Sequence, residues 1–305
     1  MHQRQFGEQK MTEMNDGAGK ARYRLADHPW AALAIFIVVN VLVLGLVGTA
    51  FAAAGLRPGG PMHQTAAHIV MLFLLTPLVL GLPKGRRGLV AYLTDTGFSR
   101  FRPLVPLVVL GLSCWVILAL CQGLGVVVFR LTEGKEVTLA FLGSVWNLGG
   151  ALPPRSAELL VSLPSALEEL AFRGVLVTLF MSRYGRNASV VIPAAAFGAM
   201  HLLNMAGGQD PTWVLGQTGS AFLTGVVYGY LFVKTRSLLP GMIMHWLGNA
   251  FVASIMAYLN ANAGTGTQAL YGVVFTFGLV PVVGLILWIK TFSRRWMGVE
   301  AMAVA

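Results

Sequence analysis

Charged side chains are scarce in this chain, and so is cysteine. Asp, Glu, Lys and Arg together make up 11% of its 305 residues, whereas 56% are hydrophobic and the mean hydropathy is +0.70. A composition this poor in charge and rich in apolar residues predicts a polytopic membrane protein. The two cysteines, Cys114 and Cys121, lie within one apolar stretch and lack the spacing of a metal site, so we expect them to be packing residues.

Three sequence features that would indicate other classes are also missing. The polar residues 1–29 carry mixed charge, which argues against a cleavable signal peptide. The chain contains no H-E-x-x-H zinc motif and no nucleic-acid-binding motif. We therefore expect neither a zincin-type protease nor a nucleic-acid partner.

Long apolar segments account for most of the chain. Because a membrane helix needs about 20 apolar residues, we predict an all-α bundle of about eight transmembrane helices. The gap between the third and fourth of them, 137–152, is Gly-rich and moderately apolar, which favours an interfacial or re-entrant segment. The eight predicted spans are 30–55, 65–82, 104–129, 156–180, 189–204 (short and interrupted by Pro193), 212–233, 237–259 and 269–289.

The basic residues are distributed unevenly between the predicted loops. If the N-terminus is cytoplasmic, 17 of the 22 Lys and Arg lie on the cytoplasmic side. This is the positive-inside pattern. It predicts a multi-pass protein of the cell membrane with both termini in the cytoplasm, and it explains the net charge of +10 by topology and anionic-lipid contact.

The fourth predicted span carries three ionisable residues, Glu168, Glu169 and Arg173. A charge at bilayer depth costs at least about 2.5 to 3.5 kcal/mol, so three together need a specific reason. Glu169 and Arg173 are four residues apart on one helical face, in the favourable order for an ion pair. Glu168 is rotated by about 100° and has no partner nearby in the sequence. We therefore interpret the pair as structural and Glu168 as a general base or acid. Pro164 should open or kink the helix beside Glu168.

Two later spans add polar groups that complete a plausible reaction centre. His201 lies in the fifth span, and His245 precedes Asn249 by four residues on one face of the seventh. Glu168 with His201 can hold and deprotonate a water. His245 and Asn249 can donate hydrogen bonds to a developing oxyanion, which is worth about 3 to 4 kcal/mol per donor.

These residues fall into three ordered motifs, EExxxR at Glu168–Arg173, FxxxH at Phe197–His201 and HxxxN at His245–Asn249. In this order and on separate spans they resemble the CPBP intramembrane proteases, a family that includes CAAX prenyl proteases and Abi proteins linked with bacteriocin immunity. The resemblance covers roughly 156–259 and does not extend to the first three spans. It implies a catalytic Glu168 with His201 as its partner, and His245 with Asn249 as oxyanion donors.

The sequence leaves open whether a metal takes part. Glu168, His201 and His245 form a possible two-His, one-carboxylate zinc site. If Glu168 were a ligand, no free base would remain, because Glu169 is expected to pair with Arg173. We therefore favour a reaction without a cofactor and keep zinc as the alternative.

The sequence predicts three regions with different roles. They are a polar cytoplasmic tail (1–29), three packing spans (30–130) and a catalytic core (156–290). The predicted function is an intramembrane endopeptidase acting on a peptide or membrane-protein substrate. The alternatives are a proton-coupled carrier, since buried Glu and His also form proton relays, and a non-catalytic immunity protein that keeps the fold.

Overall fold

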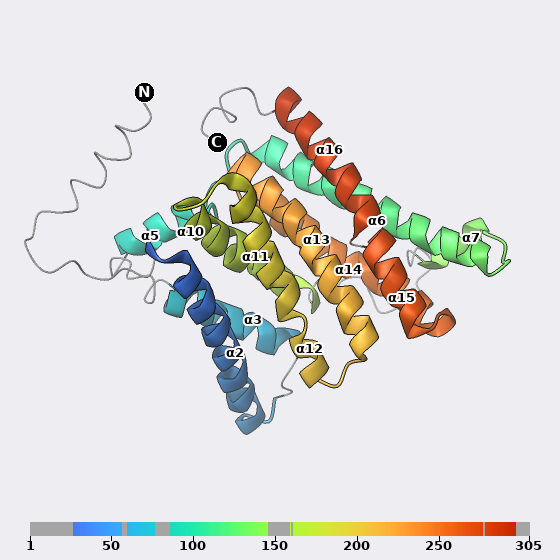
Figure 1. The fold of residues 1–305 in the computed structure, drawn as a ribbon, viewed down its shortest axis with the longest axis horizontal. Helices are drawn as coiled ribbons and strands as arrows, with labels where there is room; N and C mark the ends of the chain where they lie inside the picture. Colours follow the sequence, from blue (N-terminus) through green and yellow to red (C-terminus); the bar gives the residue numbers. More distant parts are fainter. Residues whose placement is uncertain are drawn as a thin grey trace, which may run out of the picture.

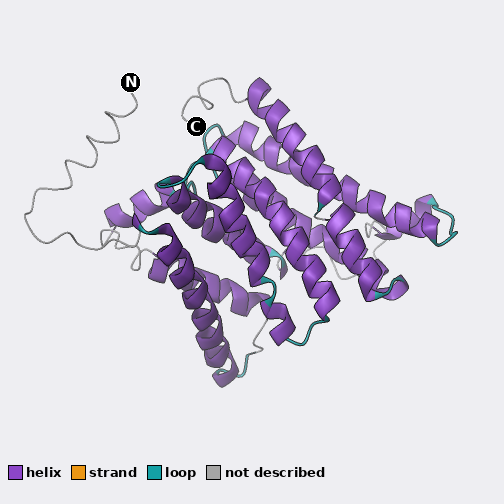
Figure 2. Cartoon of the chain, in the orientation of Figure 1, coloured by secondary structure: helices purple, strands orange, loops and turns teal. Residues whose placement is uncertain are grey.

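The computed structural model describes residues 27–56, 60–76, 86–145, 159, 161–276 and 278–296. Within these residues the chain forms helices and no strands, so the prediction of an all-α bundle is confirmed (Figure 2). The tail up to residue 26, the start of the fourth predicted span and the end of the predicted re-entrant segment lie outside the described residues.

The helical elements follow one another with short connections. In chain order they are α2 (Pro29–Ala53), α3 (Pro61–Ile69), the π-helical η2 (Val70–Leu75), α5 (Arg86–Asp95), α6 (Leu104–Thr132), α7 (Leu139–Val145), α9 (Leu163–Glu169), the π-helical η3 (Leu170–Val177), α10 (Thr178–Met181), α11 (Arg186–Met200), α12 (Leu203–Ala206), α13 (Pro211–Thr235), α14 (Leu239–Asn262), α15 (Thr265–Tyr271), the π-helical η4 (Gly272–Thr276) and α16 (Leu279–Trp296).

Helical structure is present within each of the eight predicted spans. By length and composition, four helices of the described chain are long and apolar enough to cross a membrane, which indicates a membrane protein. They are Pro29–Ala53, Leu104–Thr132, Arg186–Ala206 and Thr265–Ser293. The number of crossings and the orientation of the termini stay predictions.

Helices α13 and α14 lie in the middle of the bundle (Figure 1). Helix α11 packs along α13, and α6 packs along α14. On one side α16 closes the bundle against α6 and α13, and on the other α3 contacts both α2 and α9. The segment that carries Glu168, Glu169 and Arg173, α9 followed by η3, is thereby enclosed between α3, α11 and α14.

Small residues allow α11 and α13 to approach closely. A Cβ added at Gly225 would lie 3.0 Å from the Cβ of Ala194, and one at Gly229 would lie 2.9 Å from Val190. Membrane helices commonly pack through such small residues. Their four-residue spacing in the sequence therefore serves packing within the chain.

The N-terminal helices cover the outer side of η3. The ring of Phe36 in α2 meets that of Phe172 edge to face, with centroids 5.8 Å apart. Met71 and Leu72 of η2 are almost completely buried in the same apolar cluster. These contacts hold α2 and η2 against the helix that carries the charged residues.

The two prolines near the site behave differently from the sequence-based expectation. Pro164 occupies the first turn of α9, where its missing N–H is not needed, so it begins the helix and does not kink it. The irregularity follows Glu169 instead, where the backbone widens into the π-helix η3. Pro193 does not interrupt its helix either, since α11 continues through it from Arg186 to Met200.

Candidate active site

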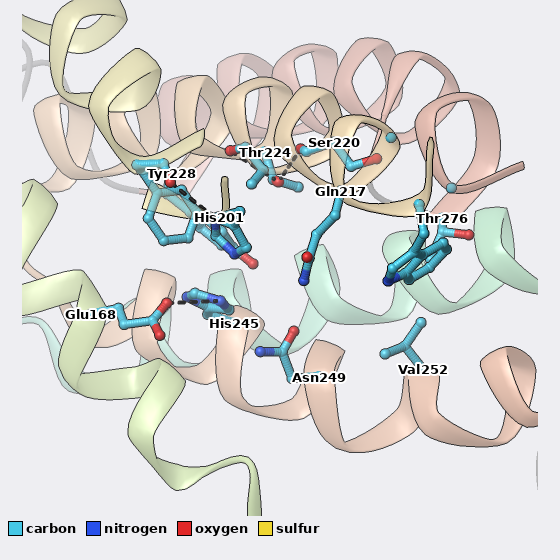
Figure 3. Close-up of a pocket in the computed structure, with 15 residues that line it drawn as sticks. Glu168, His201, Gln217, Ser220, Thr224, Tyr228, His245, Asn249, Val252 and Thr276 are labelled. Carbon is cyan, nitrogen blue, oxygen red and sulfur yellow. Dashed lines mark hydrogen bonds and ion pairs between the residues drawn. The ribbon is translucent and has the colours of Figure 1, made fainter. Parts of the chain in front are cut away.

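A cavity of about 340 Å³ opens between α9, α11, α13, α14 and η4 (Figure 3). The four residues to which the sequence assigned chemistry, Glu168, His201, His245 and Asn249, all line it. The remaining lining residues are Phe197, Trp213, Gly216, Gln217, Ser220, Ala221, Thr224, Tyr228, Val252, Gly272 and Thr276. Residues far apart in the sequence thus converge on one site.

The adjacent carboxylates of α9 have different surroundings. The Glu168 side chain is 26% exposed and faces the cavity, with its Oε2 3.9 Å from His245 Nε2. The Glu169 side chain is 1% exposed. The rotation between neighbouring helical residues places one carboxylate in the cavity and the other in the packed interior.

Glu169 and Arg173 form a buried ion pair, with Nη1 of Arg173 3.1 Å from Oε1 of Glu169. The guanidinium carbon also lies 4.5 Å from the ring centre of Phe197 and 4.9 Å from that of Tyr228, within the range of cation–π attraction. Close packing from α14 completes the enclosure, because a Cβ at Gly241 would lie 3.2 Å from Glu169 Oε2. Good geometry and additional partners are what a buried pair needs to offset its loss of hydration.

Glu169 also holds His245, a contact that the sequence did not reveal. Its Oε1 lies 2.8 Å from His245 Nδ1. An ionised carboxylate only accepts hydrogen bonds, so Nδ1 carries the proton. Nε2 is then directed toward Glu168 as an acceptor, and it can donate to an oxyanion only when the ring is protonated at both nitrogens. The Tyr228 ring stacks on the face of the imidazole, with ring centroids 4.9 Å apart and an interplanar angle of 23°, and so helps to fix its orientation.

His201 is oriented by the backbone of its own helix. It lies directly after the last residue of α11, and its Nδ1 is 3.0 Å from the carbonyl oxygen of Phe197. That carbonyl accepts, so the neutral ring presents Nε2 as an acceptor. The Phe197 ring meets both imidazoles edge to face, at 5.1 Å from His201 and 5.9 Å from His245. Phe197 therefore separates and positions the two histidines.

Asn249 lies one turn beyond His245 on α14, and its amide borders the same cavity (Figure 3). This places an amide N–H group and the His245 ring on one wall. The four-residue spacing of His245 and Asn249 predicts that they share one face of the helix, as observed.

Sequence reasoning missed the contribution of α13. Gly216, Ser220, Thr224 and Tyr228 recur every four residues and line one wall of the cavity. Their regular four-residue spacing in the sequence indicates that these residues share one face of α13. Small residues at this spacing also suit helix packing, as at Gly225 and Gly229, so the spacing alone does not distinguish a packing face from a cavity wall.

The alternative zinc site is not assembled in this arrangement. Among the residues that the structure describes, no three His, Cys, Asp or Glu side chains come close enough together to hold a metal ion. Of the two ring nitrogens of His245, only Nε2 is directed toward Glu168, because Nδ1 is hydrogen-bonded to Glu169.

Comparison with known families now supplies an independent finding. Residues 156–251 match the family model of type II CAAX prenyl endopeptidases, Rce1-like, and this segment contains all three motifs. The resemblance to the CPBP and CAAX proteases is therefore confirmed over this part of the chain, and it supports a CAAX-type intramembrane protease in general. No curated protein and no solved structure matches the chain.

The buried pair leads to a stability prediction. Glu169→Gln and Arg173→Met, made singly, should each lower stability by about 3 to 5 kcal/mol, because each strands a buried charge. The double variant should recover part of that loss. Thermal unfolding in detergent measures the effect, with Glu168→Gln as the matched control because its side chain is partly exposed. A double variant no more stable than either single would show that the pairing is not what stabilises this region.

Proposed function

We propose that the chain is an intramembrane endopeptidase that hydrolyses a peptide bond with a water activated by Glu168. The observation that carries the proposal is the asymmetry of the two carboxylates. Glu169 is already engaged by Arg173 and His245, whereas Glu168 faces a cavity bordered by two histidines and an asparagine. The match of residues 156–251 to a family of endopeptidases supports the same reaction class.

In the proposed reaction a water is held between the Glu168 carboxylate and Nε2 of His201. Glu168 takes one proton from the water while the water oxygen attacks the carbonyl carbon of the scissile bond. The electron pair of the carbonyl double bond moves onto its oxygen. Collapse of this intermediate re-forms the carbonyl and breaks the C–N bond, and Glu168 returns its proton to the leaving amine nitrogen. One carboxylate thus acts first as base and then as acid.

The negative oxygen of the intermediate would lie against the α14 wall of the cavity, which carries His245 and Asn249. Asn249 supplies an N–H donor there, and His245 supplies a second one when its ring is protonated at both nitrogens. Donors fixed before the reaction stabilise the developing charge without rearrangement. The contacts of His245 with Glu169 and Tyr228 keep its ring in place.

The proposed mechanism assigns no step to a metal, because Glu168 could not act as the base if it were a zinc ligand. Glu168 is the only acidic residue among those that line the cavity, and the proposed reaction needs it as the base. The zinc-dependent version remains the alternative to be tested directly.

We further propose that the protein crosses the cell membrane eight times with both termini in the cytoplasm. The distribution of Lys and Arg supports this orientation. The partners would be membrane lipids around the bundle and a peptide or membrane-protein substrate that reaches the cavity.

Loss of the base should abolish cleavage without unfolding the protein. Glu168→Gln should lower the rate by about 10² to 10⁴, the range typical of general acid–base catalysis. A quantitative comparison of membrane peptides from cells carrying the wild type or Glu168→Gln would reveal the cleaved species. Reconstitution of the purified proteins with a peptide found in this way then gives the rates. An equally active Glu168→Gln protein would refute the assignment.

Chelation distinguishes the two versions of the mechanism. We expect the purified protein to contain well under one equivalent of zinc and to keep its activity after prolonged exposure to a strong chelator. A zinc-bound water would instead require the ion for its ionisation near pH 7. Stoichiometric zinc, with chelator-induced loss that added zinc reverses, would overturn the metal-free mechanism and leave the protease assignment intact.

A further inference from the structure

The cavity continues well beyond the end that holds Glu168 and His245. It follows one face of α13 from Tyr228 back to Trp213, a rise of about 22 Å at 1.5 Å per residue. The far part, which we call the α13 arm, is not needed for the hydrolytic step. It is lined by Trp213, Gly216, Gln217, Ser220, Thr224, Val252, Gly272 and Thr276.

Ser220 lines the α13 arm and carries a buried hydroxyl that has no hydrogen-bond partner among the described residues. The residue is only 5% exposed, and its Oγ is a buried polar atom that no described group satisfies. Neighbouring hydroxyls are already engaged, since Thr224 donates to the Ser220 carbonyl at 2.6 Å and Thr276 to that of Tyr271 at 3.4 Å. Most buried polar groups are paired, so an unpaired one on a residue that lines a cavity points to a ligand.

Gln217 contributes a second polar group to the same arm. Its Oε1 accepts a hydrogen bond of 2.8 Å from Nδ2 of Asn204 in α12. This contact fixes the carboxamide and leaves its Nε2 as a donor. Figure 3 shows the end of the side chain directed into the cavity toward Asn249.

The remaining surface of the α13 arm is uncharged. None of its lining residues is acidic or basic, and Gly216 and Gly272 add no side chains there. A charged ligand would find no counter-charge among these residues. An acyl chain would leave the Ser220 hydroxyl and the Gln217 amide unsatisfied, which is unfavourable in a buried site.

We infer that the α13 arm binds the backbone of an extended peptide segment beside the scissile bond, with Gln217 and Ser220 donating hydrogen bonds to its carbonyl oxygens. An extended chain offers one carbonyl per residue at intervals of about 3.3 Å, so its carbonyl oxygens can accept hydrogen bonds from successive donors along the arm. The inference rests on the proposed function, because the bound segment must lead to Glu168. It makes Gln217 and Ser220 substrate-binding residues outside the three motifs.

Binding of a defined probe in the non-hydrolysing Glu168→Gln background tests this inference. The probe is a fluorescent capped pentapeptide of alanine and leucine, titrated against protein in nanodiscs. Gln217→Leu and Ser220→Ala should each weaken binding about fivefold, the effect of losing one neutral hydrogen bond. Thr218→Val is the matched control, since Thr218 also has a buried unpartnered hydroxyl on α13 but does not line the cavity. It should leave the affinity within about twofold.

Several outcomes would overturn the inference. They are absence of peptide binding, binding that Gln217→Leu and Ser220→Ala do not change, and displacement of the peptide by dodecanol, which would identify an acyl-chain site. Thermal unfolding of each variant verifies that the fold is retained. If Gln217→Leu unfolds, Gln217→Met replaces it, and if Ser220→Ala unfolds, Ser220→Cys replaces it, since neither replacement puts glycine within α13.

The inference and the proposed protease function can fail separately. The binding assay needs no cleavage, so peptide binding that depends on Gln217 and Ser220 supports the α13 arm even if no product forms. With an active enzyme, the same substitutions should raise KM about fivefold and change kcat by less than about twofold, since the contacts lie away from the reacting atoms. Glu168-dependent cleavage with unchanged KM would contradict the inference while leaving the protease intact.

Discussion

The buried contact of Glu169 with both Arg173 and His245 is the constraint on which the site depends. It joins the α9–η3 segment to α14 through one carboxylate, at 3.1 Å from the guanidinium and 2.8 Å from the imidazole. Such a group is stable in an apolar bundle only when all its strong partners are in place. The aromatic rings of Phe197 and Tyr228 enclose the network and link it to α11 and α13.

This network explains how two adjacent glutamates come to have different roles. Once Glu169 is fixed in the interior, helical rotation turns Glu168 toward the cavity, where it remains partly exposed. The same carboxylate fixes the tautomer of His245, so the ring opposite Glu168 has a defined orientation. The stabilising carboxylate, Glu169, and the reactive one, Glu168, are therefore neighbours on one helix. The close packing of α11 on α13 completes the walls of the cavity.

Much of this arrangement could be predicted from the sequence. Apolar segment lengths predicted an all-α membrane bundle, and four-residue spacing predicted which side chains share a face. Contacts between distant helices could not be predicted in this way. The hydrogen bond between Glu169 and His245 joins α9 to α14. The orientation of the Gln217 side chain depends on a hydrogen bond from Asn204 in the preceding helix α12. Proline was also misleading, because Pro164 begins α9 and the irregular backbone follows Glu169.

The tautomer of His245 tests most directly whether Glu169 organises the site. Nitrogen-15 NMR of histidine-labelled protein, with His245→Gln used to assign the signal, distinguishes the two neutral forms at high pH. The hydrogen bond to Glu169 predicts a proton on Nδ1 in the wild type and loss of this preference in Glu169→Ala. A neutral ring protonated on Nε2 in the wild type, or one unaffected by Glu169→Ala, would contradict the account.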